Sequence, residues 1–493
     1  MQTAITWLRG AAAACALASI VAAGAAPVQA QTVSGPIAGR PTLQLGNFDL
    51  APLGYVAEEF FLSGAAVSYQ ADGPQTNDGL WAVKPGPKAA YTTRLVVVRP
   101  SDPAKFNGTV VVEWLNVSAG TDGAPDWSYT HRELIRQGYA YVGVSAQKVG
   151  IDGGGRMGFP GALPIKKADP QRYASLNHPG DAYSFDIFTQ AARAIRGDGG
   201  ARLLGPLVPK RLIGDGESQS AMFLTTYVDA IEPVAHAFDG FLIHSRFGGG
   251  APLDGAFGPA AAASLGLKMR TDLHEPVFIF ISETDLLGFG AGYVTARQPD
   301  SDHLRTWEVA GTAHADTYTL GGAAVDSGAE PIKALADSFA ATHSIMGMPM
   351  PQPMNAAPQH HYVMMGALSA LNQWITSGKA PPLGQRLEVT TAVPTQLVRD
   401  ANGNALGGVR TPWMDVPTAR LTGLGQTAPG LGMLFGVTEP FDAAKLAQLY
   451  PGGKADYLKK FDLSLKAAVR AGFIPAAYEQ EIRDLAAASY PGA

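Results

Sequence analysis

Three residue types that together perform acyl chemistry lie far apart along the chain: Ser218, Asp285 and His314. A serine hydroxyl is a poor nucleophile until a neutral imidazole takes its proton. The imidazole in turn needs a carboxylate that fixes its tautomer and stabilises its cation. Each residue alone has a plainer explanation, as a helix cap, a loop residue or a hydrogen-bonding core residue. Their placement in the fold therefore decides whether they act together.

The serine lies in the stretch 211–221, which reads Arg-Leu-Ile-Gly-Asp-Gly-Glu-Ser-Gln-Ser-Ala. A short apolar run, a tight turn of small residues and the helix-like segment 221–228 follow one another. This layout holds a serine side chain above the edge of a sheet and offers helix N–H groups to an anion. The pattern is Gly-x-Ser-x-Ser and not the usual Gly-x-Ser-x-Gly, but the fifth residue is still small. In a chain with 58 glycines such a pattern also arises by chance, so the other two residues must support it.

Apolar, β-branched runs alternate with segments of helical spacing, which is typical of a parallel sheet covered by helices on both faces. The predicted strands are 93–99, 108–117, 139–145, 212–213, 238–244, 276–282 and 304–310, with helices at 127–137 and 182–195 among the connections. The sequence thus predicts an open α/β fold with a mostly parallel sheet. Ligands of such sheets bind beyond the carboxyl ends of the strands.

The acid and the histidine both follow predicted strands directly. Glu283 and Asp285 come after the strand 276–282, and His314 comes after the strand 304–310. Three residues at the ends of three strands, in this chain order, are much less frequent by accident than any one of them. We therefore predict a catalytic triad of Ser218, His314 and Asp285, with Glu283 as the alternative acid.

An oxyanion hole is expected from two backbone N–H groups. One belongs to Gln219, directly after the serine, and the other to the loop that follows the strand 108–117, where Asn116 and Val117 are the candidates. Arg246 closes the strand 238–244 and could meet a substrate carboxylate, although a structural ion pair is the stronger expectation. The pair at 360–361, His-His, is expected in an exposed loop.

Features of the whole chain limit the classes of protein to which it can belong. Residues 1–30 read as a secretory signal peptide cleaved near Ala30, and the single cysteine, Cys15, lies within it. A net charge of −5 without a basic cluster argues against nucleic acid as a partner. No later segment is apolar enough for a membrane span, and no spacing matches a zinc site. We expect a leader at 31–90 packed on the core, an α/β core at 91–380 and an accessory segment at 381–493.

At this point the chain resembles the α/β-hydrolase superfamily. More narrowly, it is similar to secreted bacterial esterase-like proteins that carry three motifs, found here at Glu113–Val117, Gly216–Ala221 and Trp307–Asp316. The resemblance covers residues 94–378 and part of the tail, from 400 to 420. It implies the hydrolase fold and esterase-like chemistry, but little about the substrate.

The sequence therefore predicts a secreted or periplasmic serine hydrolase that cleaves small carboxylic esters through an acyl-enzyme on Ser218 and needs no cofactor or metal. Two alternatives remain open. One is other acyl chemistry on the same residues, as in an amidase, lactonase, thioesterase or acyltransferase. The other is a non-catalytic binding protein that retains the fold.

Overall fold

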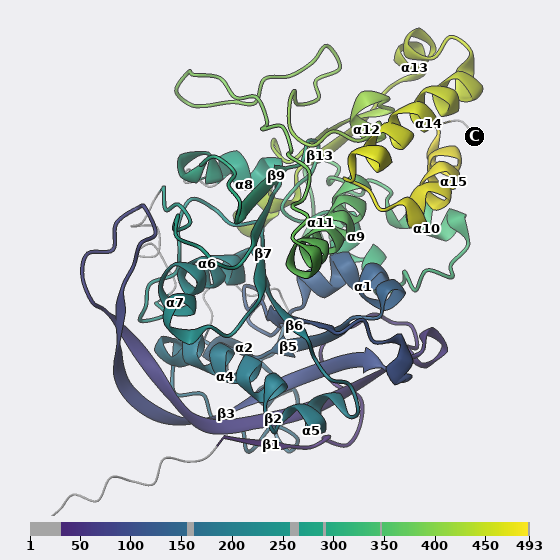
Figure 1. Ribbon diagram of the computed structural model, residues 1–493. Coiled ribbons are helices and arrows are strands. Elements are labelled where there is room, and N and C mark those ends of the chain that lie inside the picture. Colours follow the sequence, from purple (N-terminus) through teal and green to yellow (C-terminus); the bar gives the residue numbers. More distant parts are fainter. Residues whose placement is uncertain (1–30, 155–161, 257–265, 289–291, 346–347, 492–493) are drawn as a thin grey trace, which may run out of the picture.

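The computed structural model describes residues 31–154, 162–256, 266–288, 292–345 and 348–491. Within these residues one sheet of nine strands runs through the molecule (Figure 1), in the order β1-β2-β3-β5-β4-β6-β7-β8-β9. The strands are β1 (Thr32–Ser34), β2 (Tyr55–Ala71), β3 (Val83–Pro100), β4 (Thr109–Trp114), β5 (Ala140–Val144), β6 (Arg211–Glu217), β7 (Gly240–His244), β8 (Val277–Ile281) and β9 (Leu304–Glu308). The six strands from β5 to β9 in this order pair in parallel.

All seven predicted strands are present, as β3 to β9, and the prediction of a mostly parallel α/β sheet is confirmed. The structure differs from the prediction in the expected leader. There β2, with 17 residues, forms a long antiparallel ribbon with β3, and β1 pairs with β2. Acidic and small residues interrupt the apolar pattern of this ribbon. One of them, Glu59, is buried and pairs with Arg94 and Arg172.

Helices cover both faces of the sheet. On one face lie α4 (Ser184–Arg196), α5 (Gly200–Leu204) and α6 (Gln219–Thr226), which bury residues such as Phe188 and Phe223 in one apolar cluster. On the other face lie α1 (Pro125–Gln137) and α11 (Gln359–Ser377), whose Leu134 and Leu368 belong to a second cluster. This burial explains why the strands are apolar on both sides.

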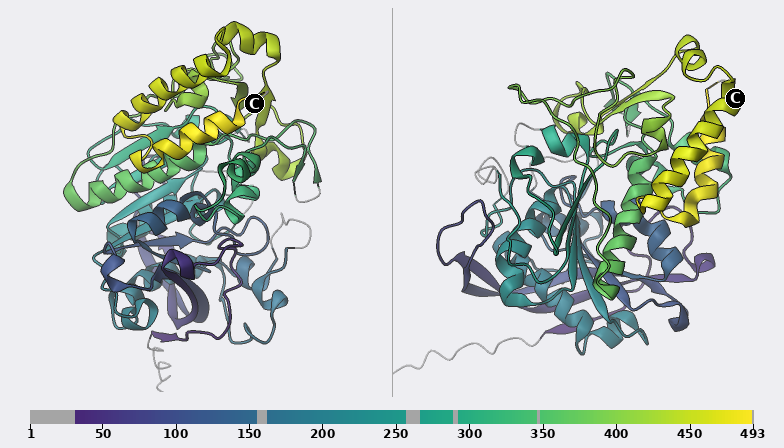
Figure 2. Two further views of the ribbon diagram at one scale, coloured as in Figure 1. Left: turned by 90° about the vertical axis from the view of Figure 1, so that its right-hand side faces the viewer. Right: turned by 45° about the horizontal axis from the view of Figure 1, so that its top comes forward.

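The C-terminal part of the chain packs against this second face. Helices α14 (Gly453–Ala471) and α15 (Glu479–Ser489) lie beside α11 (Figure 2) and share its apolar cluster through Leu465 and Ile482. Gly366 of α11 lets the backbone of Phe473 approach closely, because a Cβ there would lie 2.4 Å from its carbonyl oxygen. Before these helices come α12 (Pro412–Asp415), β12 (Ala419–Thr422), β13 (Val437–Pro440) and α13 (Ala443–Leu449).

Short elements complete the connections between strands: α2 (Lys148–Asp152), α3 (Ile165–Ala168), α7 (Glu232–Ala235), α8 (Glu283–Leu287), α9 (Thr317–Leu320) and α10 (Ile332–Ser338). None of the helices in the described ranges is long and apolar enough to cross a bilayer. The expected signal peptide, residues 1–30, lies outside the described residues.

Candidate active site

Ser218 sits on a sharp turn between β6 and α6. Its backbone has φ 59° and ψ −114°, a conformation that only a constrained non-glycine residue adopts. The turn is held by a hydrogen bond from the Ser218 N–H to the carbonyl oxygen of His244, at 3.0 Å. A Cβ on Gly216 would lie 3.3 Å from Ser220. The turn therefore needs small residues two positions before and two positions after Ser218. Gly216 and Ser220 occupy these positions, and serine is small enough for the second.

The structure brings the three predicted residues into one hydrogen-bonded chain. His314 Nε2 lies 2.8 Å from Ser218 Oγ, and His314 Nδ1 lies 2.6 Å from Asp285 Oδ1. His314 and Asp285 are buried, whereas the serine is half-buried. The ring of Phe247 stacks on the imidazole at 5.4 Å between centroids. In this geometry the imidazole can accept the serine proton while the carboxylate holds its other nitrogen.

Asp285 is fixed by the start of α8 in a reciprocal cap with Ser282. Its Oδ2 accepts the Ser282 N–H at 2.7 Å, and its own N–H donates to Ser282 Oγ at 3.2 Å. Burial works to raise the pKa of Asp285, but the charge of His314 and the hydrogen bonds from His314 and Ser282 outweigh it and hold that pKa below its usual value. The carboxylate therefore stays ionised beside the imidazole.

Glu283, the alternative acid, points away from His314. Its two oxygens accept hydrogen bonds from the Gly311 N–H at 2.6 Å, the Thr422 hydroxyl at 2.8 Å and the Gly423 N–H at 3.0 Å. The geometry thus favours Asp285 as the partner of the imidazole and leaves Glu283 as a link between loops.

A fourth residue, Glu217, reaches the same imidazole. Its Oε1 lies 3.2 Å from His314 Nε2, and its Oε2 accepts a hydrogen bond from Asn116 Nδ2 at 3.0 Å. Burial raises the pKa of Glu217 well above its usual value, and the nearby Asp126, Asp285 and Glu113 raise it further. These effects favour the protonated form of Glu217, which carries no negative charge. Glu217 was not among the predicted site residues, although a charged residue at the end of an apolar strand was a signal.

The predicted oxyanion donors fall into two groups. The N–H of Gln219 opens α6, in the turn where helix N–H groups lack an intrahelical acceptor. In the facing loop, the Asn116 N–H donates to the Gly123 carbonyl at 2.9 Å, and the Ser118 N–H donates to Asn116 Oδ1 at 2.8 Å. A turn within the loop therefore engages the Asn116 N–H, and this geometry disfavours Asn116 as an oxyanion donor. Val117 retains a weaker bond of 3.4 Å to Gln219 Oε1, so it is the better second donor.

Two other predictions are corrected by burial. Arg246 is completely buried, its guanidinium donates to the Leu267 and Phe247 carbonyls, and it lies over the Tyr293 ring. It is therefore an internal structural residue, which was the stronger expectation, but backbone carbonyl groups accept its hydrogen bonds in place of the expected ion pair. The pair His360 and His361 begins α11 and is also fully buried, so the expected exposed loop is wrong. The Pro-rich sequence before this pair gave no sign that a helix begins there.

A buried polar chain lies close behind the serine turn. His244 Nδ1 is 2.6 Å from Asp126 Oδ1, and His244 Nε2 is 2.9 Å from His360 Nε2. Burial lowers the pKa of His244 to about 3 and raises that of Asp126 well above its usual value. His244 is therefore neutral near pH 7, and burial favours the protonated form of Asp126. In the ranges that the structure describes, no three His, Cys, Asp or Glu side chains are arranged as metal ligands.

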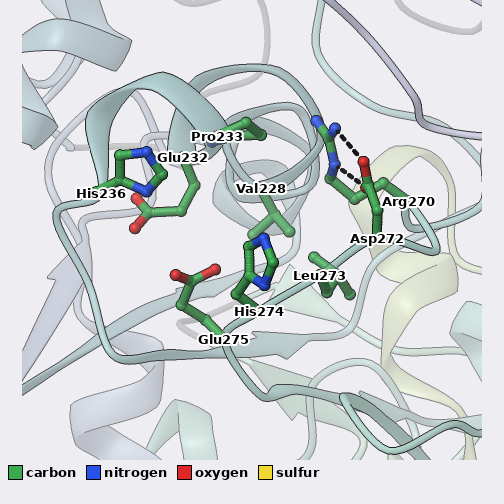
Figure 3. A pocket seen from close by; sticks show the side chains of 9 residues that line it. All are labelled: Val228, Glu232, Pro233, His236, Arg270, Asp272, Leu273, His274 and Glu275. Carbon is green, nitrogen blue, oxygen red and sulfur yellow. Dashed lines mark hydrogen bonds and ion pairs between the residues drawn. The ribbon is translucent and has the colours of Figure 1, made fainter.

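A small cavity of about 100 Å³ lies elsewhere, between the segment around α7 and the loop before β8 (Figure 3). Its lining includes Glu232, His236 and His274. These residues precede β7 and β8, whereas Ser218 follows β6, so in a parallel sheet the cavity and the serine lie at opposite edges. The cavity is therefore not the place where a substrate would meet the serine.

A comparison with known protein families agrees with the observed fold. Residues 23–484 match the family described as alpha/beta hydrolase domain. The chain belongs to this family. This match covers most of the chain, including the segment expected to be a leader and the C-terminal helices. A search of curated proteins found no match.

Solved structures give only distant similarities. The esterase rPPE is 13% identical, covering 59% of this chain and 81% of its own, with a TM-score of 0.29. An esterase of Rhizomucor miehei is 12% identical over 64% and 85%, with a TM-score of 0.27. An alpha-beta serine hydrolase homologue of Coxiella burnetii is 10% identical over 45% and 84%, also with a TM-score of 0.27. These values are too low to carry an argument about substrate.

Proposed function

We propose that this protein is a serine hydrolase that cleaves carboxylic esters through an acyl-enzyme on Ser218. The observation that carries the proposal is the continuous hydrogen-bonded chain from Ser218 Oγ through His314 to Asp285, with distances of 2.8 and 2.6 Å. It is supported by the strained backbone of Ser218, which is maintained although it is unfavourable for serine.

The residues have distinct roles in the proposed reaction. Ser218 Oγ attacks the ester carbonyl carbon while His314 Nε2 takes the hydroxyl proton, and Asp285 stabilises the imidazolium that forms. The backbone N–H groups of Gln219 and Val117 donate to the oxyanion. His314 then gives its proton to the leaving alcohol, and a water molecule activated by the same imidazole hydrolyses the acyl-enzyme. Glu217, whose Oε1 lies 3.2 Å from His314 Nε2, contacts the same imidazole, and burial favours its protonated form.

The direct test is Ser218→Ala assayed on aryl esters. Loss of the nucleophile typically lowers kcat by about 10⁶-fold, and a loss smaller than about tenfold would contradict the proposal. Ser220→Ala is the matched control, since this nearby serine is buried and its hydroxyl has no hydrogen-bond partner. We expect it to retain wild-type activity. A fluorophosphonate should label the wild type and not Ser218→Ala, because only an activated serine reacts; absence of labelling would favour a binding protein.

The kind of acyl bond needs a second experiment. Amides, lactones and thioesters, with and without acceptor alcohols, would separate an esterase from an amidase, lactonase, thioesterase or acyltransferase. We also propose that the protein is exported, with cleavage near Ala30, because the sequence of residues 1–30 has the pattern of a signal peptide. Mass spectrometry of the mature N-terminus tests this proposal.

A further inference from the structure

The two turns that carry Asp285 and His314 are both attached to the C-terminal segment, at the end of β12. Glu283, which begins the acid turn, accepts hydrogen bonds from the Thr422 hydroxyl and the Gly423 N–H. With its other oxygen it accepts the N–H of Gly311, in the loop that leads to His314. One buried carboxylate therefore links three segments of the chain.

A second contact reaches the histidine itself. The Thr284 hydroxyl donates to the carbonyl oxygen of Gly423 at 2.5 Å and accepts the backbone N–H of His314 at 3.2 Å. Thr284 is thus the intermediate in a chain of hydrogen bonds from Gly423 to the backbone of His314. Since Asp285 is the next residue after Thr284, the same contact ties together both partners of the imidazole–carboxylate pair.

The approach of the C-terminal segment is too close for any residue but glycine. A Cβ on Gly423 would lie 2.4 Å from the Thr312 carbonyl oxygen and 2.6 Å from the Thr284 nitrogen. Asn355 adds a bridge on the same side, because its Nδ2 donates to the carbonyl oxygens of Gly311 at 2.9 Å and Thr422 at 3.1 Å. The segment therefore packs directly on the backbone of both turns.

The loop that carries His314 is held mainly by other segments, although the Thr312 hydroxyl donates to the Val309 carbonyl oxygen at 2.8 Å and the Thr312 carbonyl oxygen accepts the Glu283 N–H at 3.1 Å. Residues 311–315 form neither helix nor strand. The N–H groups of Gly311 and His314 donate to Glu283 and Thr284, and that of Ala315 donates to the carbonyl oxygen of Leu434 at 3.3 Å. Each of these acceptors either belongs to the C-terminal segment or is hydrogen-bonded to it. Displacement of the segment would therefore move the imidazole relative to Ser218.

We propose that Thr422 and Gly423, acting through Glu283 and Thr284, are positioning residues that set His314 against Ser218 and Asp285. The end of β12 then positions the catalytic pair and is not only a cover for the sheet. This inference rests on the proposed function for its kinetic readout. Misplacement of a reacting group by about 1 Å can lower a rate by about a hundredfold, so loss of one link should have a measurable effect.

The test uses the full-length protein and pairs of variants. Thr284→Val removes the bridging hydroxyl at nearly constant volume, and Thr284→Ser retains it. We expect Thr284→Val to lower kcat on an aryl ester by about tenfold with KM within twofold, because the hydroxyl does not touch the substrate, and Thr284→Ser to stay within twofold of wild type. Thr422→Val removes the more distant link and should lower kcat by about threefold. Glu439→Gln, on the exposed side of β13, is the control and should change nothing.

The outcomes separate positioning from simple stabilisation. If both valine variants melt earlier but retain kcat within twofold, or if KM alone changes, the inference is overturned. If Thr284→Val does not fold, Thr422→Val decides in the same way. If the wild type cleaves no ester and reacts with no fluorophosphonate, the proposed function has failed. The low-field proton resonance of the bond between His314 Nδ1 and Asp285 then provides the readout: loss in Thr284→Val but not in Thr284→Ser supports positioning, and persistence in both overturns it.

Discussion

Asp285→Asn should abolish the proposed hydrolase activity by forcing the wrong tautomer on His314. The amide has one oxygen, and the Ser282 N–H, 2.7 Å from Oδ2, needs it as an acceptor. The amide NH₂ then faces His314 Nδ1, which must accept a hydrogen bond and carry no proton. The ring proton therefore moves to Nε2 and faces Ser218, so that the imidazole can no longer accept the serine proton.

The size of the effect follows from this geometry. A wrong tautomer in a comparable triad lowers kcat by about 10⁴-fold, or about 5.5 kcal/mol. Turning the amide round would leave its NH₂ against the Ser282 N–H, which costs about 1–3 kcal/mol. Even in that arrangement, kcat is expected to fall roughly ten- to a hundredfold. The substitution should therefore lower kcat by 10- to 10⁴-fold, nearer the upper limit.

The assay is steady-state hydrolysis of an aryl ester, with thermal melting to show that the variant is folded. Glu283→Gln provides the comparison, because Glu283 is also buried at the same turn but makes no contact with the imidazole. We expect Glu283→Gln to retain at least tenfold more activity than Asp285→Asn. The assignment of Asp285 as the acid would be refuted if folded Asp285→Asn lost less than tenfold in kcat. It would also be refuted if Glu283→Gln were less active than Asp285→Asn.

Three further predictions concern pH and packing. Because the pKa of Glu217 is raised, the wild type should lose kcat/KM at high pH as this group ionises beside Ser218; Glu217→Gln should remove that decline and stay within about threefold of wild type at pH 7. Burial raises the pKa of Glu232 to about 8. Between about pH 4.5 and pH 8 the folded state therefore keeps a proton on this carboxyl that the unfolded state has released. The free energy of unfolding falls as the pH rises through this range. Glu232→Gln should reduce that fall by about 1.4 kcal/mol per pH unit, measured by urea unfolding between pH 5 and 8; an unchanged slope would contradict this. Gly366→Ala should destabilise the protein by about 1–3 kcal/mol, because the new methyl group meets the backbone of Phe473, and an unchanged melting temperature would show that α11 and the C-terminal helices are not tightly packed.

Much of the sheet could be predicted from the sequence because its strands are buried on both faces and therefore read as unbroken apolar runs. The same pattern fixed where each strand ends, and so placed Ser218, Asp285 and His314 at one edge. The antiparallel ribbon of β2 and β3 was only partly recognised. One of its faces contains charged residues such as Glu59, which become satisfied only by arginines distant in sequence.

The remaining features depend on contacts between distant segments. Nothing local to Asn116 shows that its N–H pairs with Gly123, or that Arg246 is enclosed by carbonyl groups. The choice between Asp285 and Glu283 was likewise left open, since both lie on one turn and only the fold shows which carboxylate faces the imidazole. The glycine- and proline-rich segment 150–180 also predicts a long loop that borders the acyl or alcohol pocket, and its residues 155–161 lie outside the described part.

The link between Thr284 and Gly423 spans 139 positions of the chain. Contacts of such separation form late, because a long loop must close before they contribute free energy. A nascent polypeptide would thus hold its serine hydroxyl unreactive until almost the entire protein had emerged and folded. Competence for chemistry would then coincide with the completion of folding.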